Sequence, residues 1–431
     1  MKNILIKLAF WASFAYTFLS LLFYSLPFEF LWRASFLNIY YLKMSPPFAD
    51  FRWISATSQC GVPLIDLVRR VSPGCDIYGR NGGGLGYPPQ SVEIARLLKL
   101  TISSTQITSF CFGLALILIF LTLLHSIYGS SKSFYILATI LLSSFPLQLA
   151  IERGNLDIIV FILIVSASAL ISLKSKLFSL LSALFTYTAV AVKAYPLFGF
   201  LFFAVCSGNH LSRFRSLLLV TSSIVGLLSV IPWYLLSSSD IPSAAWRVIS
   251  HGFLIQDSAS SPLLILEQIA SALILIIGLY LGYALRLRYT FIHLYLEHLS
   301  SFKDRFIFSL TSISGFSWLA CYFISDGYDY RIIFFFPCLI FLFYYALSPT
   351  GRSSLLSNIL SKFILISIVL TSLGYYSWMA PSRLIGFNLV QVLSVVIDSL
   401  CLPLLASLSI TFLLPTFPSI ASRKLLISRH I

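Results

Sequence analysis

The stretch Phe110–Leu124, FCFGLALILIFLTLL, decides the fold class of this chain. Apolar side chains cover every face of a helix formed by these residues, which is typical of a segment surrounded by lipid or protein. A helix needs about 20 mostly apolar residues to cross the hydrocarbon core of a bilayer. Runs of similar size recur from one end of the 431 residues to the other. We therefore expect an all-α polytopic membrane protein.

The composition agrees with this expectation. Hydrophobic residues make up 58% of the chain, charged residues only 10%, and the mean hydropathy is +0.91. Soluble domains carry about 25% charged residues, so a large soluble domain is excluded. We treat 1–431 as one transmembrane domain. The net charge of +14 comes from basic residues scattered between apolar runs, so it does not indicate a nucleic-acid partner.

The apolar runs and the breaks between them predict about 12 membrane-spanning helices, with a range of roughly 10 to 13. The helices flanking Arg153 and Lys193 are short, so we expect tilted, re-entrant or broken segments there. The predicted spans are 5–27, 106–128, 134–150, 156–172, 177–192, 195–207, 216–236, 263–285, 306–324, 332–348, 363–379 and 389–414.

The distribution of loop lysines and arginines predicts the orientation. Lys2 and Lys7 precede the first apolar run, and no small-residue cleavage site follows it, so we expect an uncleaved helix. With that end in the cytoplasm, most basic residues of the short loops also become cytoplasmic, as the positive-inside rule requires. Both termini are then cytoplasmic, and residues 28–105 form a first extracytoplasmic loop.

The polar stretches with the most specific chemistry all fall on the outer face in this topology, whereas the cytoplasmic joints are short and resemble simple anchors. This segregation is what an active site at one membrane face would produce. The outer stretches are Asp50–Pro89, Glu152–Asp157, Lys193–Pro196, His251–Gly252 and Ser325–Arg331.

Arg153-Gly154-Asn155-Leu156-Asp157 opens one predicted span. On a continuous helix Arg153 and Asp157 share a face and can pair. Ionisable residues at this depth usually face a protein interior or a wet cavity. The alternative is a helix start, with Asn155 and Asp157 near the positive N-terminus.

Two further cations lie at outer span ends. Lys193, in Lys193-Ala194-Tyr195-Pro196, either anchors the helix or binds a phosphate. Arg331 ends the loop Asp326-Gly-Tyr-Asp-Tyr-Arg331, and a guanidinium at that depth requires an anionic partner such as a phosphate.

The first outer loop holds a carboxylate, Asp50, close to the first span. It can accept a proton from a hydroxyl, or it can cap a short helix that begins at Phe51. Cys60 and Cys75 are the two cysteines placed outside; an oxidising compartment allows a disulfide between them, and two free thiols are the alternative.

The order of these motifs resembles the polyprenol-phosphate-mannose-dependent mannosyltransferases, glycosyltransferase family 87 of the GT-C superfamily. The resemblance covers most of Asp50–Pro196 and rests on the early loop aspartate, Asp76-Ile77-Tyr78, Tyr87-Pro88-Pro89, Arg-Gly-Asn-x-Asp and Lys-x-Tyr-Pro. The loop from Pro63 to Arg80 is longer and more basic than this family suggests, and no Asp-x-Asp is present to indicate a metal.

The resemblance implies a GT-C-like bundle and inverting transfer of a mannose-like hexose from a polyprenyl-phosphate carrier to a glycan or glycolipid, without a cofactor. Asp50 would be the general base, with Asp76 as the alternative. The implied phosphate ligands are Arg153, Lys193, Arg331, Arg52 and Arg80, and the implied sugar or acceptor ligands are Tyr78, Tyr87, Asn155, Asp157, His251 and Asp329.

Two other functions use the same features. A flippase or transporter of lipid-linked sugars would bind the phosphate through the same cations without needing Asp50 as a base. A structural subunit would have no ligand, which the clustering of polar motifs on one face disfavours. The implied setting of the transferase is a bacterial inner membrane, with the active site facing the periplasm.

Overall fold

A computed structural model describes most of the chain, and every element in the described part is a helix. The described residues are 2–25, 48–59, 89–97, 99–101, 103–173, 175–207, 211–237, 262–287, 290–291, 301–324, 330–349, 353–379 and 400–414.

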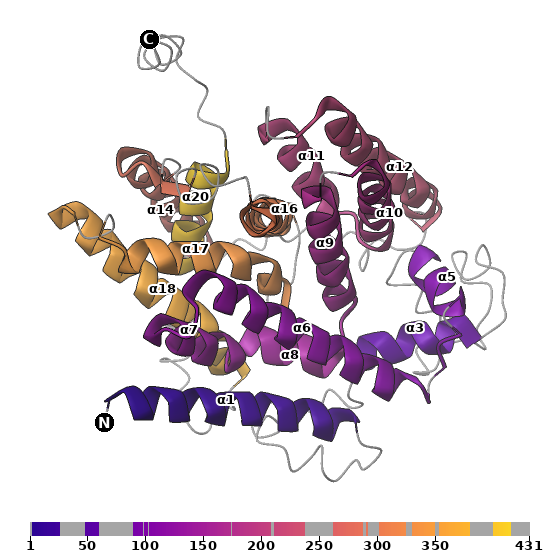
Figure 1. The fold of residues 1–431 in the computed structure, drawn as a ribbon, viewed down its shortest axis with the longest axis horizontal. Helices are drawn as coiled ribbons and strands as arrows, with labels where there is room; N and C mark the ends of the chain where they lie inside the picture. Colours follow the sequence, from indigo (N-terminus) through magenta and orange to yellow (C-terminus); the bar gives the residue numbers. More distant parts are fainter. Residues whose placement is uncertain are drawn as a thin grey trace.

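Figure 1 shows these helices crossing one another at a range of angles, with α16 seen end-on near the centre. The elements are α1 (Lys2–Ser25), α3 (Ala49–Gln59), α5 (Pro89–Leu97), α6 (Thr105–Tyr128), α7 (Lys132–Leu142), α8 (Phe145–Arg153), α9 (Leu156–Ser172), α10 (Lys176–Val192), α11 (Pro196–Cys206), α12 (Arg213–Ser237), α14 (Pro262–Ala284), α16 (Phe302–Ile324), η4 (Tyr330–Phe335, a 3-10 helix), α17 (Phe336–Leu347), α18 (Leu355–Met379) and α20 (Leu402–Leu413).

The helices confirm that the chain is a helical membrane protein. Five of them are long and apolar enough to cross a bilayer, or six if the bent pair α7–α8 makes one span. The long ones lie within α1, α6, α12, α16 and α18. Shorter apolar helices, α9 to α11 among them, coincide with other predicted spans. The total of about 12 spans stays a prediction.

The core is built around α16 and the segment η4–α17. Every residue from Ile307 to Tyr322 is buried, as is every residue from Arg331 to Phe343. Trp318 of α16 stacks on Phe335 of η4 with ring centroids 3.9 Å apart. Pro337 lies in the first turn of α17, where proline is tolerated because the missing N–H has no intrahelical partner. This core holds the end of η4 that carries Arg331.

Small residues allow close helix contact at the edge of the core. A Cβ added at Gly278 or Gly282 of α14 would collide with Ser407 or Thr411 of α20. Both pairs repeat at a spacing of four, so one face of each helix makes the contact. Small residues at this spacing are typical of membrane helices whose backbones approach closely.

The predicted span 134–150 is divided in the structure. α7 ends at Leu142, α8 begins at Phe145, and the two helices bend by 51° at the break. Pro146 lies in the first turn of α8, and the Gln148 side chain donates a hydrogen bond to the Leu142 carbonyl at 2.7 Å. The side-chain amide thereby satisfies a carbonyl that the break removes from the helical ladder, which fits the broken helix expected near Arg153.

The described parts of the predicted outer loop are folded and packed. α3 and α5 lie against each other, and the Thr105 hydroxyl of α6 donates to Ser55 Oγ at 3.1 Å. The Gln90 amide of α5 donates to the Ser229 carbonyl of α12 at 2.6 Å. The short helix expected from Phe51 begins two residues earlier, at Ala49, so Asp50 lies in its first turn.

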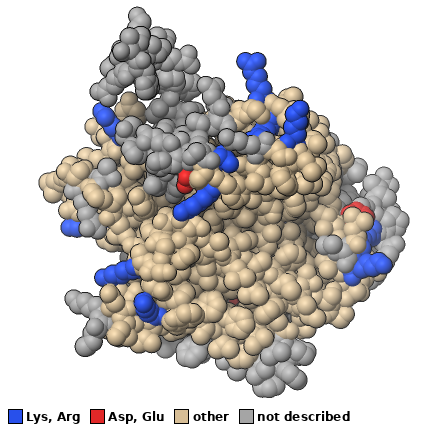
Figure 2. Space-filling view, in the orientation of Figure 1, with Lys and Arg blue, Asp and Glu red and all other residues tan. Residues whose placement is uncertain are grey.

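The surface matches a lipid environment. In Figure 2 most of the visible face is neither acidic nor basic, and Lys and Arg lie mainly around its edge. Large apolar side chains are exposed on several helices, including Leu217, Ile276 and Phe363. A monomeric soluble protein seldom exposes so many large apolar side chains, so we assign them to lipid contact.

Candidate functional site

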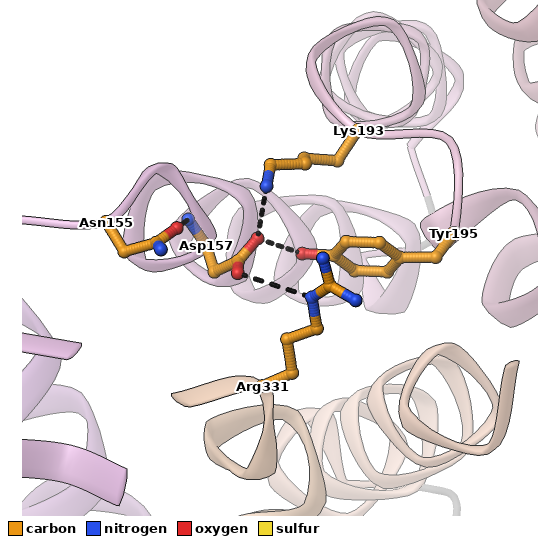
Figure 3. A network of polar contacts seen from close by, with 5 residues as sticks. All are labelled: Asn155, Asp157, Lys193, Tyr195 and Arg331. Atoms are coloured by element: carbon orange, nitrogen blue, oxygen red, sulfur yellow. Dashed lines mark hydrogen bonds and ion pairs between the residues drawn. The ribbon is translucent and has the colours of Figure 1, made fainter. Parts of the chain in front are cut away.

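Four side chains from three distant parts of the chain meet at the start of α9. Figure 3 shows Lys193 and Arg331 approaching the Asp157 carboxylate from opposite sides, while Tyr195 reaches it from a third. Asp157 is completely buried. The sequence predicted that these motifs share one membrane face, and the structure brings Asp157, Lys193 and Arg331 into direct contact.

The turn before α9 positions Asp157. Gly154 adopts the left-handed conformation, with φ of 54°, and ends α8. Asn155 then caps α9, its side-chain oxygen accepting a hydrogen bond from the Asp157 N–H at 2.9 Å. Asp157 therefore lies in the first turn of α9, where the helix dipole favours negative charge.

The continuous helix on which Arg153 and Asp157 would share a face does not form. α8 ends at Arg153 and α9 begins at Leu156, so the two residues do not share a helix face. The left-handed Gly154 breaks the helix that this pairing assumed. The alternative, a capped helix start, is confirmed for Asn155. The side chain of Arg153 lies outside the described residues.

Lys193 lies where α10 ends. Its backbone is extended, and Pro196 starts α11 three residues later. Its Nζ lies 3.5 Å from Asp157 Oδ1, and its side chain is 12% exposed. A lysine that only anchors a helix would extend into the polar interface, whereas this ammonium turns toward a buried carboxylate.

Tyr195 completes the cluster, and the sequence did not single it out as a site residue. Its hydroxyl donates a hydrogen bond to Asp157 Oδ1 at 2.5 Å. Its ring packs edge-on against Phe334, with centroids 5.2 Å apart. Its place in the Lys-x-Tyr-Pro motif, two residues after a candidate cation, was the signal that could have identified it.

Arg331 enters the cluster from η4. Its side chain is 4% exposed, its Nε lies 3.8 Å from Asp157 Oδ2, and its guanidinium lies 5.6 Å from the centre of the Tyr195 ring. The sequence required an anionic partner for this arginine. The structure provides one within the chain, the carboxylate of Asp157.

The electrostatics of the cluster follow from its composition. Two cations and one carboxylate leave it with one positive charge, and none of the three side chains is more than 12% exposed. Buried charges are stable only when paired and hydrogen-bonded, which Asp157 achieves through Lys193, Arg331 and Tyr195. Such a partly desolvated positive site favours an anionic ligand.

The helix that carries Asp50 is attached to the same turn. The Phe48 N–H donates to the Glu152 carbonyl at 2.7 Å, and Phe48 is completely buried. A Cβ added at Gly154 would lie 3.0 Å from Phe48 Cβ. The start of α3 thus packs against the turn that leads into Asp157. Arg52, also predicted as a phosphate ligand, is partly buried on the same helix.

Several predicted site residues lie outside the described part of the chain, so their roles stay predictions. They are Cys60, Cys75, Asp76, Tyr78, Arg80, Tyr87, His251 and Asp329, together with the side chain of Asp50. Within the described residues, no group of three or more His, Cys, Asp or Glu side chains could hold a metal ion.

Comparison with protein-family models, with curated proteins and with solved structures finds no match to this chain.

Proposed function

We propose that this protein is an inverting glycosyltransferase that moves a mannose-like hexose from a polyprenyl-phosphate carrier to a glycan or glycolipid acceptor. The observation that carries the proposal is the convergence of Lys193 and Arg331 on Asp157, beside the turn that holds the Asp50 helix. The reaction requires cations that stabilise the departing phosphate and a carboxylate that acts as general base.

In the proposed reaction an acceptor hydroxyl oxygen attacks the anomeric carbon of the donor sugar. The bond from that carbon to the carrier phosphate oxygen breaks, and the configuration inverts. The Asp50 carboxylate takes the hydroxyl proton. Polyprenyl phosphate leaves with an additional negative charge, which Lys193 and Arg331 stabilise electrostatically.

The proposal includes a GT-C-like arrangement of about 12 spans in a bacterial inner membrane. Both termini lie in the cytoplasm, and the site faces the periplasm. Membrane lipid surrounds the domain, the lipid-linked sugar is its donor, and no cofactor takes part. The apolar helices and the exposed apolar side chains support the location in a membrane.

The test is transfer from radiolabelled polyprenyl-phosphate mannose to an envelope-glycolipid extract by the purified protein. We expect labelled glycolipid from the wild type and a loss of about a hundredfold or more in Asp50→Asn, since a general base contributes on that scale. Asp304→Asn is the matched control, because it makes the same change at an aspartate that the topology places on the opposite face. Equal activity of the two variants would remove Asp50 as the base.

The second candidate is a flippase for the same lipid, which the cation cluster also favours. In liposomes, a flippase would move labelled polyprenyl-phosphate mannose across the bilayer without forming product, and Asp50→Asn would leave this movement unchanged. Movement without transfer would replace the transferase proposal with the flippase.

A further inference from the structure

The buried cluster holds a carboxylate at the place where the proposed donor would leave its phosphate. Asp157 touches both cations that would bind that phosphate, Lys193 at 3.5 Å and Arg331 at 3.8 Å. A site meant only to attract anions would do better without this carboxylate, because its charge opposes that of the ligand. The carboxylate therefore has a separate function.

One function of Asp157 is positional. It accepts a hydrogen bond from the Tyr195 hydroxyl at 2.5 Å while it faces the two cations. Three side chains, two from the α10–α11 turn and one from η4, therefore share one anchor on α9. The Asn155 cap and the buried surroundings fix the carboxylate itself. Cations held in this way are oriented before a ligand arrives, which reduces the entropy lost on binding.

The second function is to set the charge. With Asp157 ionised, the cluster of Asp157, Lys193, Tyr195 and Arg331 has a single positive charge; without it the charge would double. A sugar phosphodiester carries one negative charge, whereas a sugar linked through a diphosphate carries two. Within a buried site, charge interactions are strong enough to separate such ligands.

We propose that Asp157 is a specificity-determining residue, which lowers the positive charge beside Lys193 and Arg331 and thereby favours a monophosphate-linked lipid over a diphosphate-linked one. This inference rests on the proposed function, since it assumes that the cluster receives the lipid phosphate. It goes further by naming the carrier linkage that the site selects and the side chain that selects it.

The test compares binding of two probes, polyprenyl-phosphate mannose and polyprenyl-diphosphate mannose of equal chain length, to the full chain in nanodiscs. The quantity measured is the Kd for the diphosphate probe divided by the Kd for the monophosphate probe. Asp157→Asn adds one positive charge, and we expect it to lower this ratio about tenfold or more. Lys193→Gln removes one positive charge, so we expect the ratio to rise. Because nearby charges such as the buried Glu152 are the same in every variant, they do not change the direction of these shifts.

Two controls separate charge from structural damage. Asp157→Glu keeps the charge, and Tyr195→Phe removes a hydrogen bond without changing it, so both should keep the wild-type ratio. A ratio that falls equally in Tyr195→Phe and Asp157→Asn would overturn the inference, because packing would then explain it. If Asp157→Asn does not fold, the test rests on Lys193→Gln. A ratio that does not rise in Lys193→Gln would then overturn the inference.

The outcomes also separate this inference from the proposed function. A wild type that binds both probes, with a ratio that no charge change moves, would overturn the role of Asp157 and leave the transferase intact. A wild type that binds neither probe would overturn the proposed function, and the inference with it.

Discussion

Asp157 is a completely buried carboxylate that contacts two cations from other parts of the chain. We expect Asp157→Asn to destabilise the protein by about 3–5 kcal/mol, because it removes one partner from a buried group of ion-paired side chains. The midpoint of thermal unfolding in detergent measures this loss.

The control for this experiment is Glu93→Gln. Glu93 pairs with Arg96 on α5 at 3.0 Å, but its side chain is 44% exposed. An exposed pair contributes no more than about 1 kcal/mol. Similar losses in the two variants would contradict the counter-ion role of Asp157.

Tyr195 provides a second prediction at the residue scale. Tyr195→Phe removes the hydroxyl that donates to Asp157 and keeps the ring that packs against Phe334. A hydrogen bond to a charged group contributes about 1.5–3 kcal/mol, so we expect destabilisation of that order. Chemical unfolding in mild detergent measures this loss of stability.

Tyr135→Phe is the control for this prediction. The contacts described for Tyr135 are made by its ring, with Phe10 and Lys7 among its partners. An equal loss of stability in Tyr135→Phe would argue against the Asp157 hydrogen bond.

At the scale of elements, the turn between α8 and α9 determines the shape of the site. It ends one helix, starts the next and receives the start of α3. The sequence correctly indicated a helix start at Asn155 and short helices nearby. It did not indicate that Phe48, more than a hundred residues earlier, packs on Gly154, because contacts between distant segments leave no periodic pattern.

Gly154 provides a test of this turn, because its backbone is left-handed and a Cβ there would press on Phe48. Gly154→Ala should lose about 1–2 kcal/mol from the left-handed backbone. We also expect it to expose the first loop to limited proteolysis, because the Phe48 contact is disturbed. Gly129→Ala is the control: its backbone, with φ of 56° and ψ of −152°, is also strained for alanine, but a Cβ there would meet nothing within 4 Å. It should leave proteolysis of the first loop unchanged, and equal proteolysis of the two variants would show that the Phe48 contact contributes nothing.

At the scale of the whole molecule, the membrane topology is the prediction to test. With the seven native cysteines replaced, Arg80→Cys should react with an impermeant maleimide in intact cells, because the long first loop is predicted to lie outside. Lys303→Cys, at the start of α16, should react only after permeabilisation. The reverse pattern would invert the orientation and move the proposed site to the cytoplasmic face.

Much of the fold could be predicted because lipid restricts the choices of the backbone. In a bilayer the chain must satisfy its hydrogen bonds internally, so apolar runs become helices, as α6, α12 and α16 do close to their predicted limits. The division of 134–150 had a local signal in Pro146, because a proline inside an apolar run ends or kinks a helix. The sequence did not indicate that the Gln148 side chain satisfies the Leu142 carbonyl at the break.

The sequence by itself determined the helical membrane class, the approximate helix limits and the candidate polar site residues, because hydrophobicity and helix signals are local properties. Only the tertiary structure decided that Asp157 pairs with Lys193 and Arg331, and that Tyr195 belongs to the cluster. The physical reason is that a buried charge takes its partners from whichever elements pack around it. That packing depends on where α9, α10 and η4 meet, which is a property of the whole fold.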